Sequence, residues 1–258
     1  MKFSYSNIST FSQCAYRWYL QYVERLKTIP DTNEDNALFL GLGLHKGIET
    51  GSAELGVEEY KSHYNILTDE NINYIIQLEY QIPKVIELLP TDGEHELEID
   101  TDDFKGYIDY VCGDTLFDFK FSNNIDRYKT SPQLSIYKYY LELVRPDIKI
   151  NHLKYVFVPK IQIRQKKTET IQQFRTRLRE NLLSSEIKIV EVSYNRNSIA
   201  QFQQCCQQLN EQLICADAEY PKNPTRLCAW CPYVDYCKSN GQLDYMILKI
   251  KQGEENYV

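Results

Sequence analysis

The chain has 258 residues, enough for one large domain or two small ones. Hydrophobic residues make up 43% and charged residues 25%, values typical of a globular protein, which excludes a mainly disordered chain. No apolar run approaches the roughly 18 residues that a membrane-spanning helix needs, and residues 1–10 lack the apolar stretch of a signal peptide. We therefore expect a soluble, cytoplasmic protein whose eight cysteines serve metal or redox chemistry rather than disulfides.

The formal net charge is −7, from 29 Lys and Arg against 36 Asp and Glu. This balance argues against a protein that coats nucleic acid non-specifically. Between residues 160 and 179, however, seven cations accompany one carboxylate, Glu169. The cations of this basic strip are Lys160, Arg164, Lys166, Lys167, Arg175, Arg177 and Arg179. The strip is either the wall of a groove that admits a polyanion or a solvated helix face, and the sequence leaves both open.

Helical patterns fill the first ninety residues. Residues 7–26 predict a helix with a broad apolar face, a polar loop follows, and further helices are predicted from about 37 to 89. Short β-branched and aromatic segments at 94–99, 106–111 and 115–121 then predict three consecutive strands. A tight turn is predicted at Cys112-Gly113-Asp114, between the second and third strands.

Helices and strands alternate in the second half of the chain. Helices are predicted at 132–144, 175–183 and 198–215, and strands at 148–159 and 187–192. The part from residue 221 onward is irregular and contains cysteines. This order predicts a mixed α/β fold, with helices before and after a central sheet.

Two carboxylates and a lysine fall on the predicted hairpin. Asp118 and Lys120 are two residues apart on one strand, so their side chains point to the same face, and the hairpin can bring Asp109 beside Asp118. Adjacent carboxylates repel each other unless a cation lies between them, and Mg²⁺ or Mn²⁺ prefers such oxygen ligands. That cation would polarise a phosphate, and Lys120 could hold a water or stabilise the developing charge. An isolated Asp-x-Lys is also common on surface strands.

Other candidate residues lie on the predicted helices. His45 and Glu49 share one helical face, and so do Gln133 and Tyr137. Their ordinary alternatives are a packed histidine, a solvated glutamate, a surface glutamine and a core tyrosine. Residues 41–47 contain three glycines, but their spacing is not that of a nucleotide-binding loop and no strand precedes them, so we discard that interpretation.

In order and spacing these pieces resemble the RecB-like branch of the PD-(D/E)xK nuclease superfamily. The matching segments are Gly41-x-x-x-His45-x-x-x-Glu49, Gly106-Tyr-Ile-Asp109, Asp118-Phe-Lys120 and Gln133-Leu-Ser-Ile-Tyr137. The resemblance implies a restriction-endonuclease-like α/β fold, a central mixed sheet flanked by helices. It implies metal binding by His45, Asp109, Asp118 and the Phe119 carbonyl, catalysis by Lys120 with Asp109 and Asp118, and positioning of DNA by Gln133 and Tyr137. An acidic residue of the preceding strand, Glu96 or Glu98, is expected to face the same site, and the sequence does not separate them.

A tight cysteine trio, Cys228, Cys231 and Cys237, has the spacing C-x2-C-x5-C. Thiolates this close converge on one metal centre, for which Cys14 is the candidate fourth ligand. The spacing does not exclude zinc, but zinc ribbons usually use two local cysteine pairs, which favours iron–sulfur over zinc and over unligated thiols. A centre joining Cys14 to the trio would close most of the chain into a loop, so its loss is expected to free both ends. The other cysteines lack metal spacing, and Cys205, Cys206 and Cys215 are expected to be buried thiols on a helix.

The start from Ser4 to Ala15, together with the trio, is similar to iron–sulfur RecB-like nucleases, among them CRISPR-associated iron–sulfur exonucleases and stand-alone phage and prokaryotic relatives. Ala15 replaces the usual proline. The resemblance implies a [4Fe–4S] cluster that joins the N- and C-terminal segments through Cys14, Cys228, Cys231 and Cys237. It covers Ser4 to Cys237, so we expect a single nuclease domain over 1–258. Its expected parts are a helical insertion at 27–90, a nuclease core at 94–193 and a cysteine-rich loop at 221–240.

The resemblance implies a Mg²⁺- or Mn²⁺-dependent exonuclease that degrades single-stranded DNA from the 5′ end in a bacterial, archaeal or phage-infected cytoplasm. It implies DNA with single-stranded or frayed ends as partner, protein partners of recombination, replication or CRISPR type, no membrane, and room for a homo-oligomer. The alternative is an iron–sulfur protein that binds DNA ends or docks a partner with a silent nuclease site. A third hypothesis is a redox sensor. Asp109, Asp118 and Lys120 are all present, which favours the enzyme.

Overall fold

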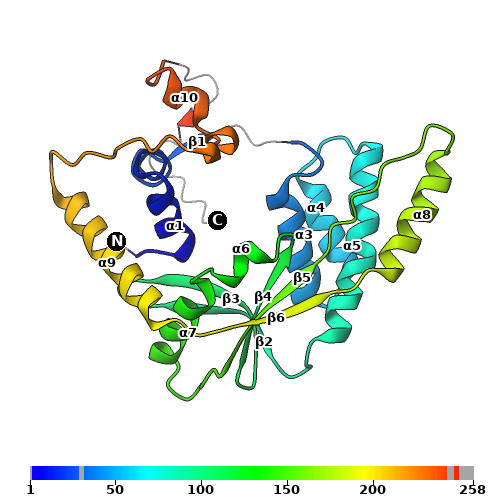
Figure 1. Ribbon diagram of the computed structural model, residues 1–258, viewed down its shortest axis with the longest axis horizontal. Helices are drawn as coiled ribbons and strands as arrows, with labels where there is room; N and C mark the ends of the chain where they lie inside the picture. Colours follow the sequence, from blue (N-terminus) through cyan, green and yellow to red (C-terminus); the bar gives the residue numbers. More distant parts are fainter. Residues whose placement is uncertain (1, 29–31, 243–246, 250–258) are drawn as a thin grey trace. The chain divides into compact units, whose positions relative to one another are not determined.

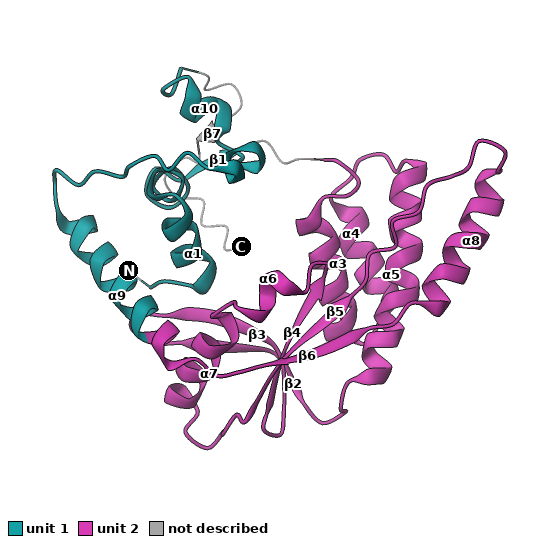
Figure 2. Cartoon of the chain, in the orientation of Figure 1, with its two compact units in different colours: residues 1–31, 200–258 teal, residues 32–199 magenta. Residues whose placement is uncertain are grey.

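The computed structural model describes residues 2–28, 32–242 and 247–249. The chain divides into two compact units (Figure 2). The larger unit is the continuous segment 32–199, and the smaller unit combines residues 1–31 with residues 200–258. The smaller unit is therefore built from segments that lie on either side of the larger unit in the sequence.

The larger unit is built on one five-stranded sheet in the order β2-β3-β4-β5-β6. Its strands are β2 (Glu94–Asp100), β3 (Lys105–Cys112), β4 (Thr115–Phe121), β5 (His152–Val158) and β6 (Lys188–Val192). Strands β4 and β5 run parallel and the other neighbours are antiparallel, so the sheet is mixed, as the sequence predicts. The predicted strand at 148–159 is shorter in the structure and begins at His152.

The hairpin between β3 and β4 places the two predicted carboxylates next to each other. Its loop contains Gly113, whose φ of 57° suits a two-residue hairpin. The register pairs Cys112 with Thr115 and Tyr110 with Phe117. One step further along this register, Asp109 lies opposite Asp118.

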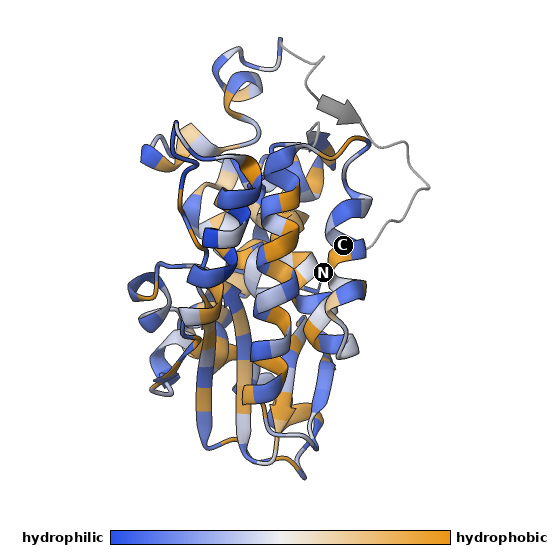
Figure 3. Ribbon diagram, turned by 90° about the vertical axis from the view of Figure 1, so that its right-hand side faces the viewer, coloured by the Kyte–Doolittle hydropathy of each residue, from blue (hydrophilic) through white to orange (hydrophobic). Residues whose placement is uncertain are grey.

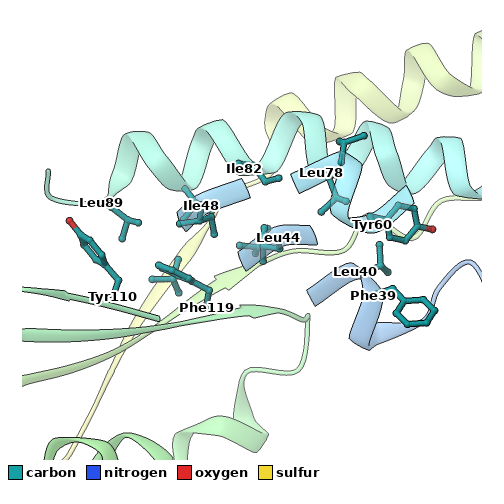
Figure 4. Close-up of a cluster of buried hydrophobic side chains, with 14 of the residues drawn as sticks. Phe39, Leu40, Leu44, Ile48, Tyr60, Leu78, Ile82, Leu89, Tyr110 and Phe119 are labelled. Carbon is teal, nitrogen blue, oxygen red and sulfur yellow. The ribbon is translucent and has the colours of Figure 1, made fainter. Parts of the chain in front are cut away.

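Helices cover both faces of the sheet (Figure 1). One face is covered by α3 (Ala37–Thr50), α4 (Ala53–Ser62) and α5 (Asp69–Leu88), with α8 (Ile171–Ser184) packed on α5. The other face carries α7 (Gln133–Val144), preceded by the short helix α6 (Asp126–Lys129). The main core lies between α3, α5 and the sheet, where Leu44 and Ile48 of α3 approach Phe119 and Tyr110 (Figure 4).

The glycines of α3 allow α3 and α4 to approach each other backbone to backbone. A Cβ atom at Gly43 would lie 2.7 Å from the carbonyl oxygen of Gly56, and a Cβ at Gly56 would lie 2.5 Å from that of Gly43. No larger residue fits this approach without moving a backbone. By contrast, a Cβ at Gly41 would meet no atom within 4 Å. The glycine-rich segment therefore serves helix packing.

The smaller unit contains short elements from both of its segments. They are α1 (Tyr5–Gln13), α2 (Ala15–Trp18), a π-helical turn (Tyr19–Val23), β1 (Leu26–Thr28), a 3₁₀ helix (Arg226–Trp230), α10 (Val234–Lys238) and β7 (Ile247–Lys249). The long helix α9 (Arg196–Ile214) begins in the larger unit and continues into the smaller one. Strands β1 and β7 pair antiparallel.

The single helix predicted at 7–26 is wrong, because the helix breaks at Cys14. Cys14 is extended, with φ −162° and ψ 109°. The backbone N–H of Tyr16 donates to the Pro221 carbonyl at 3.1 Å instead of continuing α1. A partner from the distant C-terminal segment therefore ends the helix at the predicted metal ligand.

Contacts between protein atoms hold the two segments of the smaller unit together. The Tyr233 hydroxyl donates to the Leu26 carbonyl at 2.6 Å in a buried position. Trp18 is completely buried, stacks on Tyr220, and donates its indole N–H to the Asn7 side chain at 2.7 Å. The Tyr233–Leu26 and Trp18–Tyr220 contacts join the two segments directly through protein atoms.

None of the helices in the described part of the chain is long and apolar enough to cross a membrane. Hydrophilic and hydrophobic residues alternate along the helices in Figure 3, as expected for helices with one buried face. The buried faces of the helices contribute their apolar side chains to the hydrophobic cores.

Candidate active site

Side chains from four elements of the larger unit meet around the end of the β3–β4 hairpin. Ligand atoms of His45 from α3, Glu96 from β2 and Asp109 from β3 all lie within 4.8 Å of one another. Strand β4 adds Asp118 and Lys120. Two carboxylates with one imidazole form a donor set that suits a divalent metal ion.

His45 is held by the neighbouring strands. Its Nε2 lies 3.0 Å from the Phe119 carbonyl oxygen, and its Nδ1 lies 3.4 Å from Oδ1 of Asp109. The N–H of Phe119 donates to Oδ2 of Asp109 at 2.6 Å. Burial alone would lower the pKa of His45, but the charge and hydrogen bond of Asp109 raise it to about 9. The imidazole and the carboxylate therefore hold each other in place.

Glu96 belongs to this group, whereas Glu98 does not. Glu98 points to solvent, where it binds Lys105 and the Tyr107 hydroxyl, both at 2.9 Å. Glu96 has a φ of 47°, a left-handed conformation that is rare for a residue with a side chain. Burial raises the pKa of Glu96, and the carboxylate of Asp109 raises it further. The alternative left open by the sequence is resolved in favour of Glu96.

Asp118 and Lys120 form a buried ion pair beside this group. Lys120 Nζ lies 2.5 Å from Oδ2 of Asp118, yet this oxygen has no hydrogen bond of good geometry. Burial raises the pKa of Asp118 to about 6, with Lys120 opposing and Asp109 adding to the shift. The ammonium group also lies 5.7 Å from the ring centre of Tyr128 and 6.0 Å from that of Tyr155. The ammonium group of Lys120 thus engages Oδ2 of Asp118.

Gln133 and Tyr137 lie one helical turn apart at the start of α7. The Gln133 side chain donates to the Tyr137 hydroxyl at 3.5 Å. Burial raises the pKa of Tyr137, and the carboxylates of Asp118 and Asp109 raise it further. Glu49, in contrast, is a surface residue that pairs with Lys46 at 3.1 Å.

The four predicted cysteine ligands line one cavity of about 750 Å³ in the smaller unit. Its charged lining consists of cations alone, namely Arg17, Lys222, Arg226 and Lys238. Burial raises the pKa of the Cys237 thiol, the three other thiols raise it further, and Lys222 opposes them. Among the described residues, no three cysteines bring their sulfur atoms within 4.8 Å of one another. A tetrahedral zinc site needs about 3.8 Å, from Zn–S bonds of about 2.3 Å.

Residues 221–223 connect Cys14 to the cysteine trio. The Asn223 side chain donates to the Gln13 carbonyl at 2.9 Å, next to Cys14. The Lys222 ammonium donates to the Cys237 carbonyl at 2.8 Å. Two of the remaining predictions for thiols need correction: Cys215 is exposed, just after the end of α9, and Cys205 is only partly buried, whereas Cys206 is buried as expected.

The basic strip is partly consumed by ion pairs. Arg175 lies 2.8 Å from Asp69, and Arg177 lies 2.7 Å from Glu169. Lys160 is partly buried, and burial lowers its pKa. Two of these cations are ion-paired and the third is partly buried. The strip is therefore not uniformly open to a polyanion.

The comparisons with known proteins agree with this geometry. No curated protein matches the sequence. Among solved structures, a protein from Eubacterium rectale described as a "Putative exonuclease" is similar in fold, with 12% sequence identity and a TM-score of 0.50 over 89% of this chain and 92% of that chain. The family model of the PD-(D/E)XK nuclease superfamily matches residues 2–238. Because this match spans almost all of the sequence and includes the hairpin, the histidine and the lysine described above, the chain belongs to the PD-(D/E)XK nuclease superfamily.

Proposed function

We propose that the protein is a Mg²⁺- or Mn²⁺-dependent exonuclease that hydrolyses single-stranded DNA from its 5′ end. The observation that carries this proposal is the approach of His45, Glu96 and Asp109 to within 4.8 Å, beside the Asp118–Lys120 pair. Membership of a nuclease superfamily supports the reaction class. The substrate strand and the direction of cleavage come from the resemblance alone.

The residues fit a divalent metal ion. His45, Glu96, Asp109 and the Phe119 carbonyl supply one imidazole nitrogen and three oxygen-bearing groups, and Asp118, which is ion-paired with Lys120, adds a further carboxylate. Carboxylates placed this close would repel each other without a cation between them. When bound, the metal polarises the scissile phosphate and lowers the pKa of a water molecule.

Lys120 is the proposed catalytic cation. Asp118 fixes its ammonium group on one side, and the rings of Tyr128 and Tyr155 limit its movement on the other. A cation held in this way stabilises the negative charge that builds on the phosphate as water attacks phosphorus and the P–O bond breaks in line. Gln133 and Tyr137, whose side chains are hydrogen-bonded to each other, would orient the strand from α7.

We also propose that Cys14, Cys228, Cys231 and Cys237 hold a [4Fe–4S] cluster. The cavity that all four cysteines line supports this assignment. The cationic lining suits thiolates, because neighbouring positive charge favours the deprotonated form. The cluster would add a covalent link between two segments that protein contacts already hold together.

The test is cleavage of single-stranded DNA labelled at either the 5′ or the 3′ end, with Mg²⁺ or Mn²⁺, by anaerobically purified protein. Short 5′-labelled products released first would support 5′-end cleavage, and release from the 3′ label would overturn the polarity alone. Retained DNA binding without cleavage under every metal condition would overturn the enzyme and select a DNA-end-binding protein. Colourless but active protein would overturn only the iron–sulfur assignment.

A further inference from the structure

A second polar cavity, of about 650 Å³, lies in the larger unit near the start of α7. Residues 129–131, residue 135 and residues 193–198 line it. Hydroxyl and amide groups dominate this lining, the two charged residues are both cations, and no carboxylate takes part. A surface of this kind is complementary to an anion rather than to a cation or an apolar group.

The two cations of this cavity form few strong interactions with other protein groups. Lys129 forms a 2.8 Å ion pair with Asp126, but both side chains are more than half exposed, and such pairs contribute little. Within the described part of the chain, Arg196 forms no ion pair and no side-chain hydrogen bond, although its charge acts on the neighbouring Tyr194 hydroxyl. An arginine whose planar guanidinium is unoccupied can bind two oxygens of one phosphate.

Short chains of contacts connect the cavity to the proposed catalytic residues. Tyr128, which directly precedes Lys129, has its ring centre 5.7 Å from Lys120 Nζ. The hydroxyl of Ser131, another lining residue, accepts the N–H of Gln133 at 3.4 Å. The cavity is thus joined to the residues proposed for catalysis and for strand positioning.

The cavity also has a fixed frame. The hydroxyl of Ser135 is buried on α7 and accepts the N–H of Asn195 at 3.0 Å. The Asn195 side chain in turn accepts the N–H of Asn197 at 3.0 Å. The start of α9, which carries Arg196, is therefore tied to α7, the helix that carries Gln133.

We infer that this cavity is a phosphate subsite, which binds a backbone phosphate of the DNA strand near the one that is cleaved. The inference rests on the proposed nuclease function, because it takes the DNA strand as the ligand. Arg196 and Lys129 would supply the charge, and the hydroxyl groups around them would donate to the non-bridging oxygens. Contacts of this kind position a strand without reading its sequence.

If the cavity is a phosphate subsite, removing its cations should weaken DNA binding but should not slow the cleavage step. Each phosphate contact contributes about 0.7 to the slope of log affinity against log salt for a single strand. Arg196→Gln should weaken binding of a single-stranded oligonucleotide several-fold and lower the salt slope by about 0.7, and adding Lys129→Gln should extend both effects. Cleavage at saturating DNA should continue near the wild-type rate, with a raised KM, because neither side chain is proposed to touch the reacting atoms.

Arg145→Gln is the matched control. It also removes one positive charge, but Arg145 lies at the other end of α7 and pairs with Asp147 at 3.2 Å. Affinity should be measured over a range of salt concentrations, with Ca²⁺ in place of the catalytic metal to prevent cleavage. If Arg196→Gln and Arg145→Gln have the same affinity and the same salt slope, the subsite is refuted while the nuclease proposal stands.

A second measurement identifies the phosphate itself. Oligonucleotides with one neutral methylphosphonate linkage, placed at each position in turn, remove one charge from the DNA. One linkage should weaken binding to the wild type and should not weaken binding to Arg196→Gln any further, as in a double-mutant cycle. If no linkage behaves in this way, the inference is wrong. A wild type that neither binds nor cleaves DNA would overturn both proposals together.

Discussion

Glu96 lies opposite Asp109, between the paired residues His95–Tyr110 and Leu97–Ile108 of β2 and β3. Like charges directly opposite each other across two strands are destabilising. The left-handed backbone of Glu96, with φ 47°, adds conformational strain at the same residue. Both costs fall on a residue whose carboxylate lies next to His45 and Asp109. Such a concentration of strain and repulsion is typical of a site that receives a cation.

Glu96→Gln should weaken Mn²⁺ binding by at least about ten-fold, as expected when a metal-ligand shell is disturbed. Without metal, the same change should raise stability by roughly 0.2–1 kcal/mol, because one of two facing negative charges is removed. Calorimetric titration with Mn²⁺ and melting in a chelator measure the two effects. Glu98→Gln, on the same strand but facing solvent, is the control and should leave the Mn²⁺ affinity unchanged. Equal Mn²⁺ affinity of the two variants would remove Glu96 from the metal site.

Lys120→Met should reduce cleavage by at least about 100-fold, because it removes a fixed positive charge from the developing transition state. DNA binding should stay within a small factor of the wild type, since the variant keeps the surrounding side chains. Initial cleavage rates and fluorescence-anisotropy binding measure these separately. Lys154→Met, on the neighbouring strand with its ammonium near Phe117, is the matched control and should cleave normally. Normal cleavage by Lys120→Met would exclude this lysine from the mechanism.

Cys14→Ser should lose most of the iron and the visible absorbance of anaerobically purified protein, because it removes the ligand that lies outside the trio. Cys215→Ser, which changes an exposed thiol outside the cavity, should keep both. Iron content and the visible spectrum provide the comparison. Full cluster content in Cys14→Ser would show that the fourth ligand is a residue other than Cys14.

Removal of the cluster should leave the two segments of the smaller unit attached, contrary to the expectation from loop closure alone. The Tyr233–Leu26 hydrogen bond and the residues 221–223 hold them through protein atoms. The chain has two tryptophans, Trp18, which is fully buried, and Trp230, which is 78% exposed. In Trp230→Phe, the emission maximum of Trp18 should therefore remain at short wavelength after the cluster is chelated. A shift to the wavelength of a solvated indole would show that the ends have separated.

Gly43→Ala should destabilise the protein by about 1–3 kcal/mol, because its Cβ would overlap the Gly56 carbonyl. Gly41→Ala lies on the same helix and meets no atom, so it should be neutral or stabilise by up to about 1 kcal/mol through helix propensity. Urea unfolding of both variants measures this difference. Equal stabilities would mean that α3 and α4 can move apart at little cost.

Local patterns in the sequence were sufficient to predict the sheet and the residues around it. Alternating apolar residues predicted the strands, and the two-residue spacing of Asp118 and Lys120 placed them on one face. The same alternation could not separate Glu96 from Glu98, since both fall on one face of an ideal strand. They differ because the backbone turns at Glu96, and nothing in the local sequence predicts this turn.

These local patterns could not predict contacts between segments that are far apart in the sequence. The apolar periodicity continues past Cys14, but the hydrogen bond from Tyr16 to Pro221 breaks the helix there. The ion pair of Arg175 with Asp69 likewise joins residues 106 positions apart, so the basic strip looked more open in the sequence than it is. The cavity at Arg196 combines residues 129–131 and 135 with residues 193–198, which only the folded chain brings together.

The division of the chain has a consequence for the order of events during synthesis. The hydrogen bond between Leu26 and Tyr233 can form only after Tyr233 has been synthesised. The ribosome adds the 207 residues between them in about 10–40 s at usual rates of translation. Residues 32–199 are continuous and can fold while the ribosome is still adding the rest. The carboxylates and the lysine would therefore be assembled before the cysteine cavity exists. If the cavity holds the proposed cluster, the cluster can therefore be inserted only after Cys237 has been synthesised, when residues 32–199 can already be folded.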